Sequence, residues 1–248
     1  ALALVDRGTN AQAWAATQTL LADPLRVLGE RGDDGALARG IRHLEAALTV
    51  QNRESDPDGW TMTMNLLGAS LQAQGALGDD AALRRSVEIF EQVLLLVPRR
   101  DATWVRVQSN LGGVLLMLGE RGDDDALSRS IGAFEAALSV ASRDSDPEGW
   151  AGVQTNLGNA LSVSGGRGDR NALSRSISAY EAALTVATPE SNAHGWATVQ
   201  LGLGLALQVL GDSGDHEALR RSIRIFESVL RVMTPDRDRN LWARAQNN

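Results

Sequence analysis

The sequence predicts an all-α protein, a right-handed superhelical solenoid built from antiparallel helix hairpins. Three observations support this prediction: a rare residue recurs at a nearly constant spacing, each repeating block contains two segments of helical periodicity, and no segment alternates as a half-exposed strand does. The recurring residue is tryptophan, which occurs six times in 248 residues. The tryptophans are Trp14, Trp60, Trp104, Trp150, Trp196 and Trp242, spaced 46, 44, 46, 46 and 46 residues apart.

Other residues keep step with the tryptophans. Most blocks have a glycine eight residues after the tryptophan, and each complete block has a Gly-Asp pair near its middle, followed by an arginine and then a glutamate. The arginines are Arg39, Arg85, Arg129, Arg175 and Arg221, and the glutamates are Glu45, Glu91, Glu135, Glu181 and Glu227. Because a catalytic role would not need the same residue five times, these two series predict an ion-pair ladder along the solenoid.

Each block reads as two helices. In the fourth block, residues 150–164 place apolar side chains on one arc of a helix, and the glycine-rich residues 165–168 end it. Asp169 or Asn171 can cap the second helix by accepting a hydrogen bond from a free backbone N–H. That second helix, residues 170–186, again has apolar residues at helical spacing.

The connections between blocks contain helix-start signals. Asp56-Pro57 and Asp146-Pro147 each precede a tryptophan, and aspartate as cap with proline in the first helical position favours a helix start. Ser145 and Glu148 could instead form a capping box. The first block is the least regular, because Pro24 lies inside its first helix and is expected to kink or end it.

The segments 156–161 and 176–184 together resemble the tetratricopeptide repeat, whose usual unit has about 34 residues. The units here are longer, and resemble the long-unit variety found in bacterial multidomain proteins. The resemblance covers residues 1–248 as a single array, with repeats that start near each tryptophan and partial repeats at both ends. We therefore expect the chain to be an internal slice of a longer array. The tryptophans are expected to be buried between adjacent hairpins.

Composition limits the partners. The formal net charge is −7, and all 24 basic residues are arginine, so no basic face for nucleic acid is evident. No run of about 18 apolar residues could span a membrane. Cysteine is absent, which suits a reducing compartment, so a cytoplasmic location is expected; a secreted protein without cysteine is the alternative.

No constellation for catalysis, cofactor binding or metal binding is found in the sequence. His43, His194 and His216 fall at unrelated phases of the repeat, and none has a second histidine at zinc-binding spacing. The aspartate-rich loops, such as residues 122–125, lack the alternating oxygen ligands of a calcium loop, and helix capping explains them. The sequence therefore predicts a protein that is not an enzyme and needs no cofactor.

One stripe of each first helix faces away from its own hairpin, and the family resemblance implies that this face lines a concave, peptide-binding groove. The predicted partner-binding residues are Met62, Asn65, Ala69, Gln72, Arg106, Ser109, Gly113, Leu116, Gly152, Thr155, Asn159, Ser162, Thr198, Leu201, Leu205 and Gln208. Because the stripe contains one charge, Arg106, it suits a neutral or mildly apolar segment better than an acidic one. The alternative is that these residues pack against the next repeat.

The repeat pattern leads to two candidate functions. The chain is expected to be a scaffold that binds a protein or peptide, or a flanking domain of the same polypeptide, within a larger signalling or regulatory protein. The alternative is a structural array that associates end to end with further copies.

Overall fold

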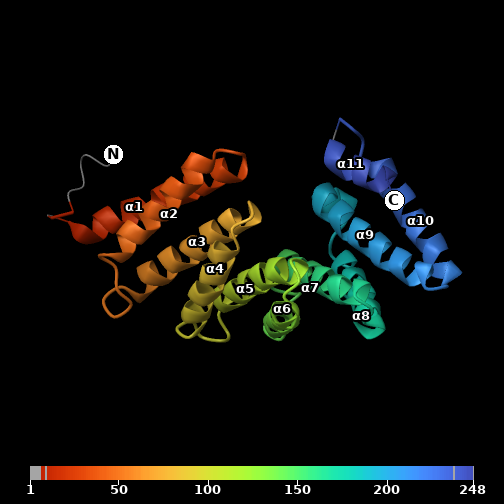
Figure 1. Cartoon of the computed structure of the whole chain (residues 1–248), viewed down its shortest axis with the longest axis horizontal. Coiled ribbons are helices and arrows are strands. Elements are labelled where there is room, and N and C mark those ends of the chain that lie inside the picture. Colours follow the sequence, from red (N-terminus) through yellow and green to blue (C-terminus); the bar gives the residue numbers. More distant parts are fainter. Residues whose placement is uncertain (1–6, 9, 237, 248) are drawn as a thin grey trace. The chain divides into compact units, whose positions relative to one another are not determined.

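The computed structural model describes residues 7–8, 10–236 and 238–247, apart from the side chain of Asp34. These residues form eleven helices and no strand (Figure 1), so the predicted all-α fold of helix hairpins is confirmed. The chain divides into two compact units, Ala1–Ala126 and Leu127–Asn248. The helices are α1(Ala11–Glu30), α2(Asp34–Leu48), α3(Pro57–Ala76), α4(Asp80–Leu94), α5(Ala102–Glu120), α6(Asp124–Leu138), α7(Pro147–Gly166), α8(Arg170–Leu184), α9(Pro189–Asp212), α10(His216–Val232) and α11(Arg239–Gln246).

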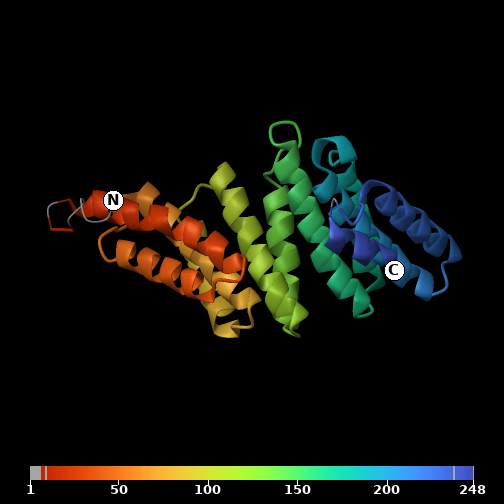
Figure 2. The ribbon, with the colours of Figure 1, turned by 90° about the horizontal axis from the view of Figure 1, so that it is seen from above.

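Consecutive helices pair as hairpins. In the first unit α1 packs on α2 and α3 on α4, and in the second unit α7 packs on α8 and α9 on α10 (Figure 2). We call α1, α3, α5, α7 and α9 the first helices, and α2, α4, α6, α8 and α10 the second helices. Within a unit, neighbouring first helices also touch: α1 and α5 each contact α3, and α7 contacts α9. Within each unit, a repeat therefore presents its first helix beside the first helix of the next.

The Gly-Asp pairs connect the two helices of each hairpin. The glycines adopt φ angles between 100° and 110°, in the left-handed region that a residue with a side chain enters only at a cost. The aspartates then cap the second helices; Asp169, for example, accepts from the backbone N–H of Ala172 at 3.0 Å. Of the two caps considered for this helix, the structure uses Asp169 and not Asn171.

Three of the first helices, α3, α5 and α7, also begin at aspartate caps, whereas α1 begins at Asn10 and α9 at Thr188. Asp56 and Asp146 accept from the N–H of Gly59 and Gly149, and a proline occupies the first turn in both cases. The capping box of Ser145 and Glu148 is therefore not formed.

Of the two effects expected at Pro24, a kink or an end of the first helix, the end does not occur. Helix α1 runs from Ala11 to Glu30 with Pro24 inside it. Proline removes the hydrogen bond to the carbonyl of Leu20, four residues earlier, but both Pro24 and Leu20 are exposed. Water can bond that carbonyl, so the helix continues.

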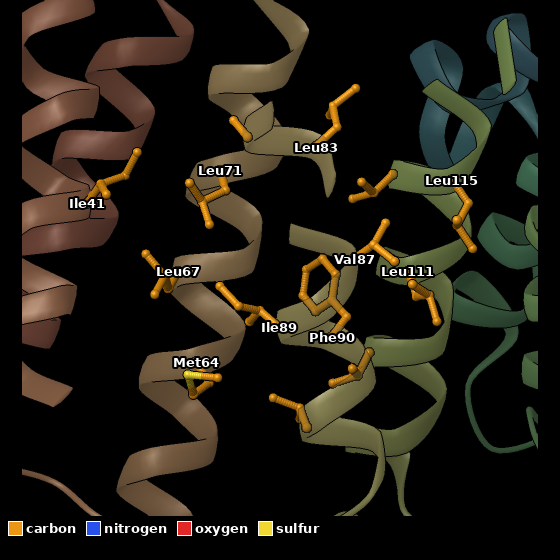
Figure 3. Close-up of a cluster of buried hydrophobic side chains, with 14 of the residues drawn as sticks. Ile41, Met64, Leu67, Leu71, Leu83, Val87, Ile89, Phe90, Leu111 and Leu115 are labelled. Atoms are coloured by element: carbon orange, nitrogen blue, oxygen red, sulfur yellow. The ribbon is translucent and has the colours of Figure 1, made fainter. Parts of the chain in front are cut away.

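Apolar side chains from α2, α3, α4 and α5 point toward one another and form the core of the first unit (Figure 3). Phe90 of α4 lies at its centre and is fully buried. A Cβ built on Gly68 of α3 would lie 2.7 Å from a carbon of the Phe90 ring. Gly158 stands in the same relation to Tyr180 in the second unit, also at 2.7 Å. The glycine that recurs eight residues after tryptophan thus lets an aromatic ring of the second helix lie against the first helix.

This close approach gives a stability prediction with a matched control in the same helix. Gly158→Ala should lower the free energy of unfolding by about 1–3 kcal/mol, because the new methyl group overlaps the Tyr180 ring. Gly152→Ala should raise it by about 0.5–1 kcal/mol, since its Cβ meets no atom within 4 Å and alanine favours helix. Urea unfolding measures both variants. Equal changes in the free energy of unfolding of the two variants would show that the contact between Gly158 and the Tyr180 ring is not tight.

Candidate interaction surface

The tryptophans are mainly packing residues. Trp104 and Trp196 are buried, as predicted, whereas Trp14, Trp60, Trp150 and Trp242 are only partly buried. The predicted burial is therefore confirmed at two sites and incomplete at four.

Arginines of the linkers cover three of these indoles. The guanidinium carbons of Arg7, Arg99 and Arg143 lie 5.2, 5.5 and 5.7 Å from the ring centres of Trp14, Trp104 and Trp150.

Two of these arginines also reach the end of a second helix. Arg7 donates to Oγ1 of Thr49 at 3.0 Å, and Arg143 donates to the backbone carbonyl of Thr185 at 3.4 Å. Thr49 and Thr185 each follow the last residue of a second helix. A cation at a helix C-terminus is electrostatically favourable, so these contacts tie the second helix to the tryptophan of its own repeat.

The predicted ion-pair ladder is present within each unit. Arg85 of α4 donates to Glu45 of α2 at 2.7 Å, and in the second unit Arg175 and Arg221 pair with Glu135 and Glu181. All six side chains are more than 40% exposed, so each pair contributes little to stability. The ladder accounts for the recurrence of these residues without a catalytic role.

The first-helix face of the first unit contains a hollow of about 440 Å³ between α1 and α3. Thr19 and Thr63 are buried there, with hydroxyl oxygens 2.8 Å apart, and Thr63 donates to Oε1 of Gln51 at 2.8 Å. Leu20 and Met62 are 67% and 52% exposed. The hollow is lined by Gln12, Ala13, Ala16, Thr19, Leu20, Gln51, Asp56, Gly59, Met62 and Thr63.

A second hollow of about 540 Å³ lies further along the same face, where α1, α3 and α5 meet. Its amides are partly engaged: Asn110 donates to Asn65 at 3.4 Å, and Gln72 approaches the Met117 sulfur at 3.8 Å. It is lined by Arg26, Gly29, Glu30, Ala69, Gln72, Ala73, Ala76, Leu77, Asn110 and Met117. Both hollows lie on the face that the sequence assigned to partner binding.

The predicted residues of the first unit divide into three groups. Met62, Ala69 and Gln72 line the hollows. Arg106 is exposed on α5, and Asn65, Ser109 and Gly113 are partly buried. Leu116, however, is buried, so the expectation that it contacts a partner is wrong. A first helix has neighbours on two sides, and only a narrow strip of it stays open.

In the second unit Leu201 is fully buried, which also contradicts its assignment to the partner-binding stripe. It packs with Trp196, Phe226 and Leu241, because α11 covers that side of α9. Leu205 is exposed and Gln208 partly exposed, so they remain on an open strip.

Polar residues of the stripe in the second unit are largely bonded within the protein. Thr155 and Thr198 donate to carbonyls of their own helices, and Ser162 lies 2.6 Å from the Ser176 hydroxyl. Asn159 accepts from the Tyr180 hydroxyl at 2.7 Å. These bonds lie within one helix or one hairpin, so they engage the polar side chains without showing the packing against the next repeat that was the alternative.

The hollows also contain α1 residues that are absent from the predicted stripe. The irregular first block provided no stripe residues. The same phase counted from Trp14 gives Ala16, Thr19, Asp23 and Arg26, and three of these four line a hollow. The signal was therefore present in the sequence, and the irregularity at Pro24 obscured it.

Two polar groups of the repeat core have unusual surroundings. Burial raises the pKa of Tyr180 to about 12, and hydrogen bonds with the hydroxyls of Ser162 and Ser176 oppose this rise.

The surroundings of the glutamine four residues after tryptophan differ between repeats. Gln18 contacts Nδ1 of His43, whereas the buried Oε1 of Gln200 has no partner among the described residues. Met64 stands at this position in the second repeat.

No protein family profile and no curated protein matches the sequence. Among solved structures, the crystal structure of MamA protein is 16% identical with a TM-score of 0.56, covering 88% of this chain and 91% of that chain. The structure of BtubC (BKLC) from P. vanneervenii is 16% identical with a TM-score of 0.51, covering 93% of this chain and 95% of that one. These likenesses show the fold alone, and they fit a tetratricopeptide-like helical repeat. Within the described residues, no helix is both long and apolar enough to cross a bilayer.

The Tyr180 pKa predicts a loss of stability at high pH. The unfolded tyrosine ionises near pH 10 and the folded one at about pH 12, so raising the pH through this window favours the unfolded state by up to about 3 kcal/mol. The chain has one tyrosine and no lysine or cysteine, so no other side chain is expected to titrate there. Absorbance of the phenolate, with urea unfolding at each pH, measures the effect. Tyr180→Phe should abolish this pH dependence, and a normal titration near pH 10 would contradict it.

The unpartnered glutamine gives a second prediction. Gln200→Met should raise the free energy of unfolding by about 1 kcal/mol or more, because it removes a buried acceptor and conserves volume. Gln18→Met should lower it by about 1 kcal/mol, because His43 loses its partner. Thermal unfolding compares the two. A destabilised Gln200→Met variant would show that Oε1 is hydrogen-bonded in solution.

Proposed function

We propose that this chain is a protein-interaction scaffold that binds an extended peptide segment on its first-helix face, within a larger signalling or regulatory protein. The observation that carries the proposal is the pair of hollows between α1, α3 and α5. Concave, largely apolar sites with a few polar groups are the usual form of a binding site. The helical-repeat fold supports a scaffold in general, because such folds present extended binding surfaces.

The spacing of the hollows suggests the length of the bound segment. Met62 lines the first hollow and Ala73 the second, and eleven residues of helix correspond to about 16 Å. An extended peptide covers this distance with about five residues. We therefore expect two anchor side chains about five residues apart.

The charged residues around the hollows suggest the chemical character of the bound segment. Helices α1 and α3 contain Asp23, Glu30 and Asp58 against one cation, Arg26, which is paired with Asp23 and Glu30. Asp56 adds a carboxylate to the wall of the first hollow. Repulsion disfavours an acidic segment, so the preferred ligand is neutral or weakly basic and has aliphatic or aromatic anchors.

Phage-displayed peptides selected on the wild-type chain provide the test. The double variant Leu20→Asp, Met62→Asp should weaken binding of the selected peptides at least tenfold, because two charges enter an apolar rim. Both side chains are exposed, so folding should survive, and circular dichroism checks this. Ile223→Asp is the control, since Ile223 is equally exposed but lies on α10. If the selected peptides bind the folded double variant as tightly as the control, recognition does not use this face.

A further inference from the structure

The end of α4 departs from a pattern that three of the other repeats share. The residue after the second helix is Thr49, Ser139 or Thr185 in three repeats, and each hydroxyl donates to a carbonyl three residues earlier at 2.6 Å. In the second repeat this residue is Leu95, which is 84% exposed, the highest exposure of any large apolar side chain among the described residues. Leu96, which follows it, is 40% exposed.

The exposure of these leucines is fixed by the surrounding backbone. The N–H groups of Leu95 and Leu96 donate to carbonyls of α4 at 3.3 and 3.0 Å, and Asp101 closes the following turn onto Pro98 at 2.9 Å. The adjacent residues Leu94 and Val97 pack against the core of the first unit. Since both flanking side chains point inward, Leu95 and Leu96 are held outward.

The linker after α4 is also basic. Where the first and third linkers have Arg53-Glu54 and Arg143-Asp144, this shorter one has Arg99-Arg100. Both arginines are exposed, and the described residues contain no ion pair for either. Arg99 lies over Trp104, and Asp101, the only acid of this linker, caps α5 by accepting from Thr103. The corner is thus a cationic spot on a chain with a net charge of −7.

We propose that this corner, formed by Leu95, Leu96, Arg99 and Arg100, docks an acidic amphipathic segment of a partner protein. The apolar side chains of that segment cover the two leucines, and its carboxylates pair with the two guanidinium groups. The site is separate from the first-helix hollows and does not depend on their function.

The observations favour a short protein segment over other occupants. Two leucines and two arginines form a patch well below the roughly 800 Å² per partner of a stable protein–protein interface, so a second copy of the chain is not expected to associate through it alone. The excess of negative charge on the chain works against approach to an anionic lipid surface. A short acidic peptide is repelled less than a lipid surface, because it carries few charges, salt screens the distant ones, and its carboxylates meet the two arginines.

The repeats themselves supply the test variant. Leu95→Thr, Leu96→Val gives the corner the sequence of Thr49-Val50 and Thr185-Val186, so the fold should be unchanged. Arg100→Glu copies Glu54. The probe is a synthetic library of about twelve-residue peptides in which Asp or Glu alternates with Leu or Phe, measured by fluorescence anisotropy. A matched library with Arg in place of the acids is the control.

Acidic members of the library should bind the wild-type chain, and their affinity for each corner variant should be at least tenfold lower. The double variant Leu20→Asp, Met62→Asp should bind them as the wild type does, which separates this site from the first-helix face. Equal binding by the corner variants, or preference for the basic library, would overturn the proposal. Two other results would also overturn it, in each case if no acidic peptide binds. The wild-type chain could bind phosphatidylserine vesicles and the corner variants lose that binding. Or the wild-type chain could self-associate in sedimentation and the corner variants lose that association.

Discussion

The close contact between the two helices of each hairpin is the constraint on which the rest of the structure depends. Gly68 and Gly158 let the rings of Phe90 and Tyr180 lie against the backbone of the first helix, and Gly75 and Gly165 do the same for Leu83 and Leu173. With the two helices this near, the ring fills the centre of the hairpin, and apolar side chains on its outer faces remain available, as in the cluster that runs from α2 to α5. Those outer faces can then pack on the neighbouring repeats.

Most recurring residues of the chain serve this stacking. The aspartate caps fix where helices begin, and the Arg–Glu pairs join neighbouring second helices. Two linker arginines, Arg7 and Arg143, link a tryptophan to the end of its own second helix. Because these roles repeat with the unit, a residue that recurs in every block is explained by packing. Recognition of a partner is to be sought where one repeat differs from the others.

The sequence was sufficient for whatever depends on local geometry. Asp146-Pro147 and the Gly-Asp pairs predicted helix starts and turns correctly, because capping needs only neighbouring residues. The sequence was insufficient where a segment distant in the chain decides whether a side chain is buried. Leu201 lies on the outward arc of its own helix, yet α11 buries it. The hollows arise from how α1 lies beside α3, which no single block encodes.

The difference between features shared by all repeats and features of one repeat also bears on where a binding site can lie. A groove on the first helices would be a property of the array, since each repeat contributes a similar strip, and its selectivity must come from particular side chains such as Leu20 and Met62. The corner after α4 belongs to one repeat only. Three repeats show that this corner folds with a hydroxyl residue, so the fold does not require an exposed leucine there. An apolar residue that the fold does not need, held in solvent by well-formed hydrogen bonds, is better explained by an interaction than by packing.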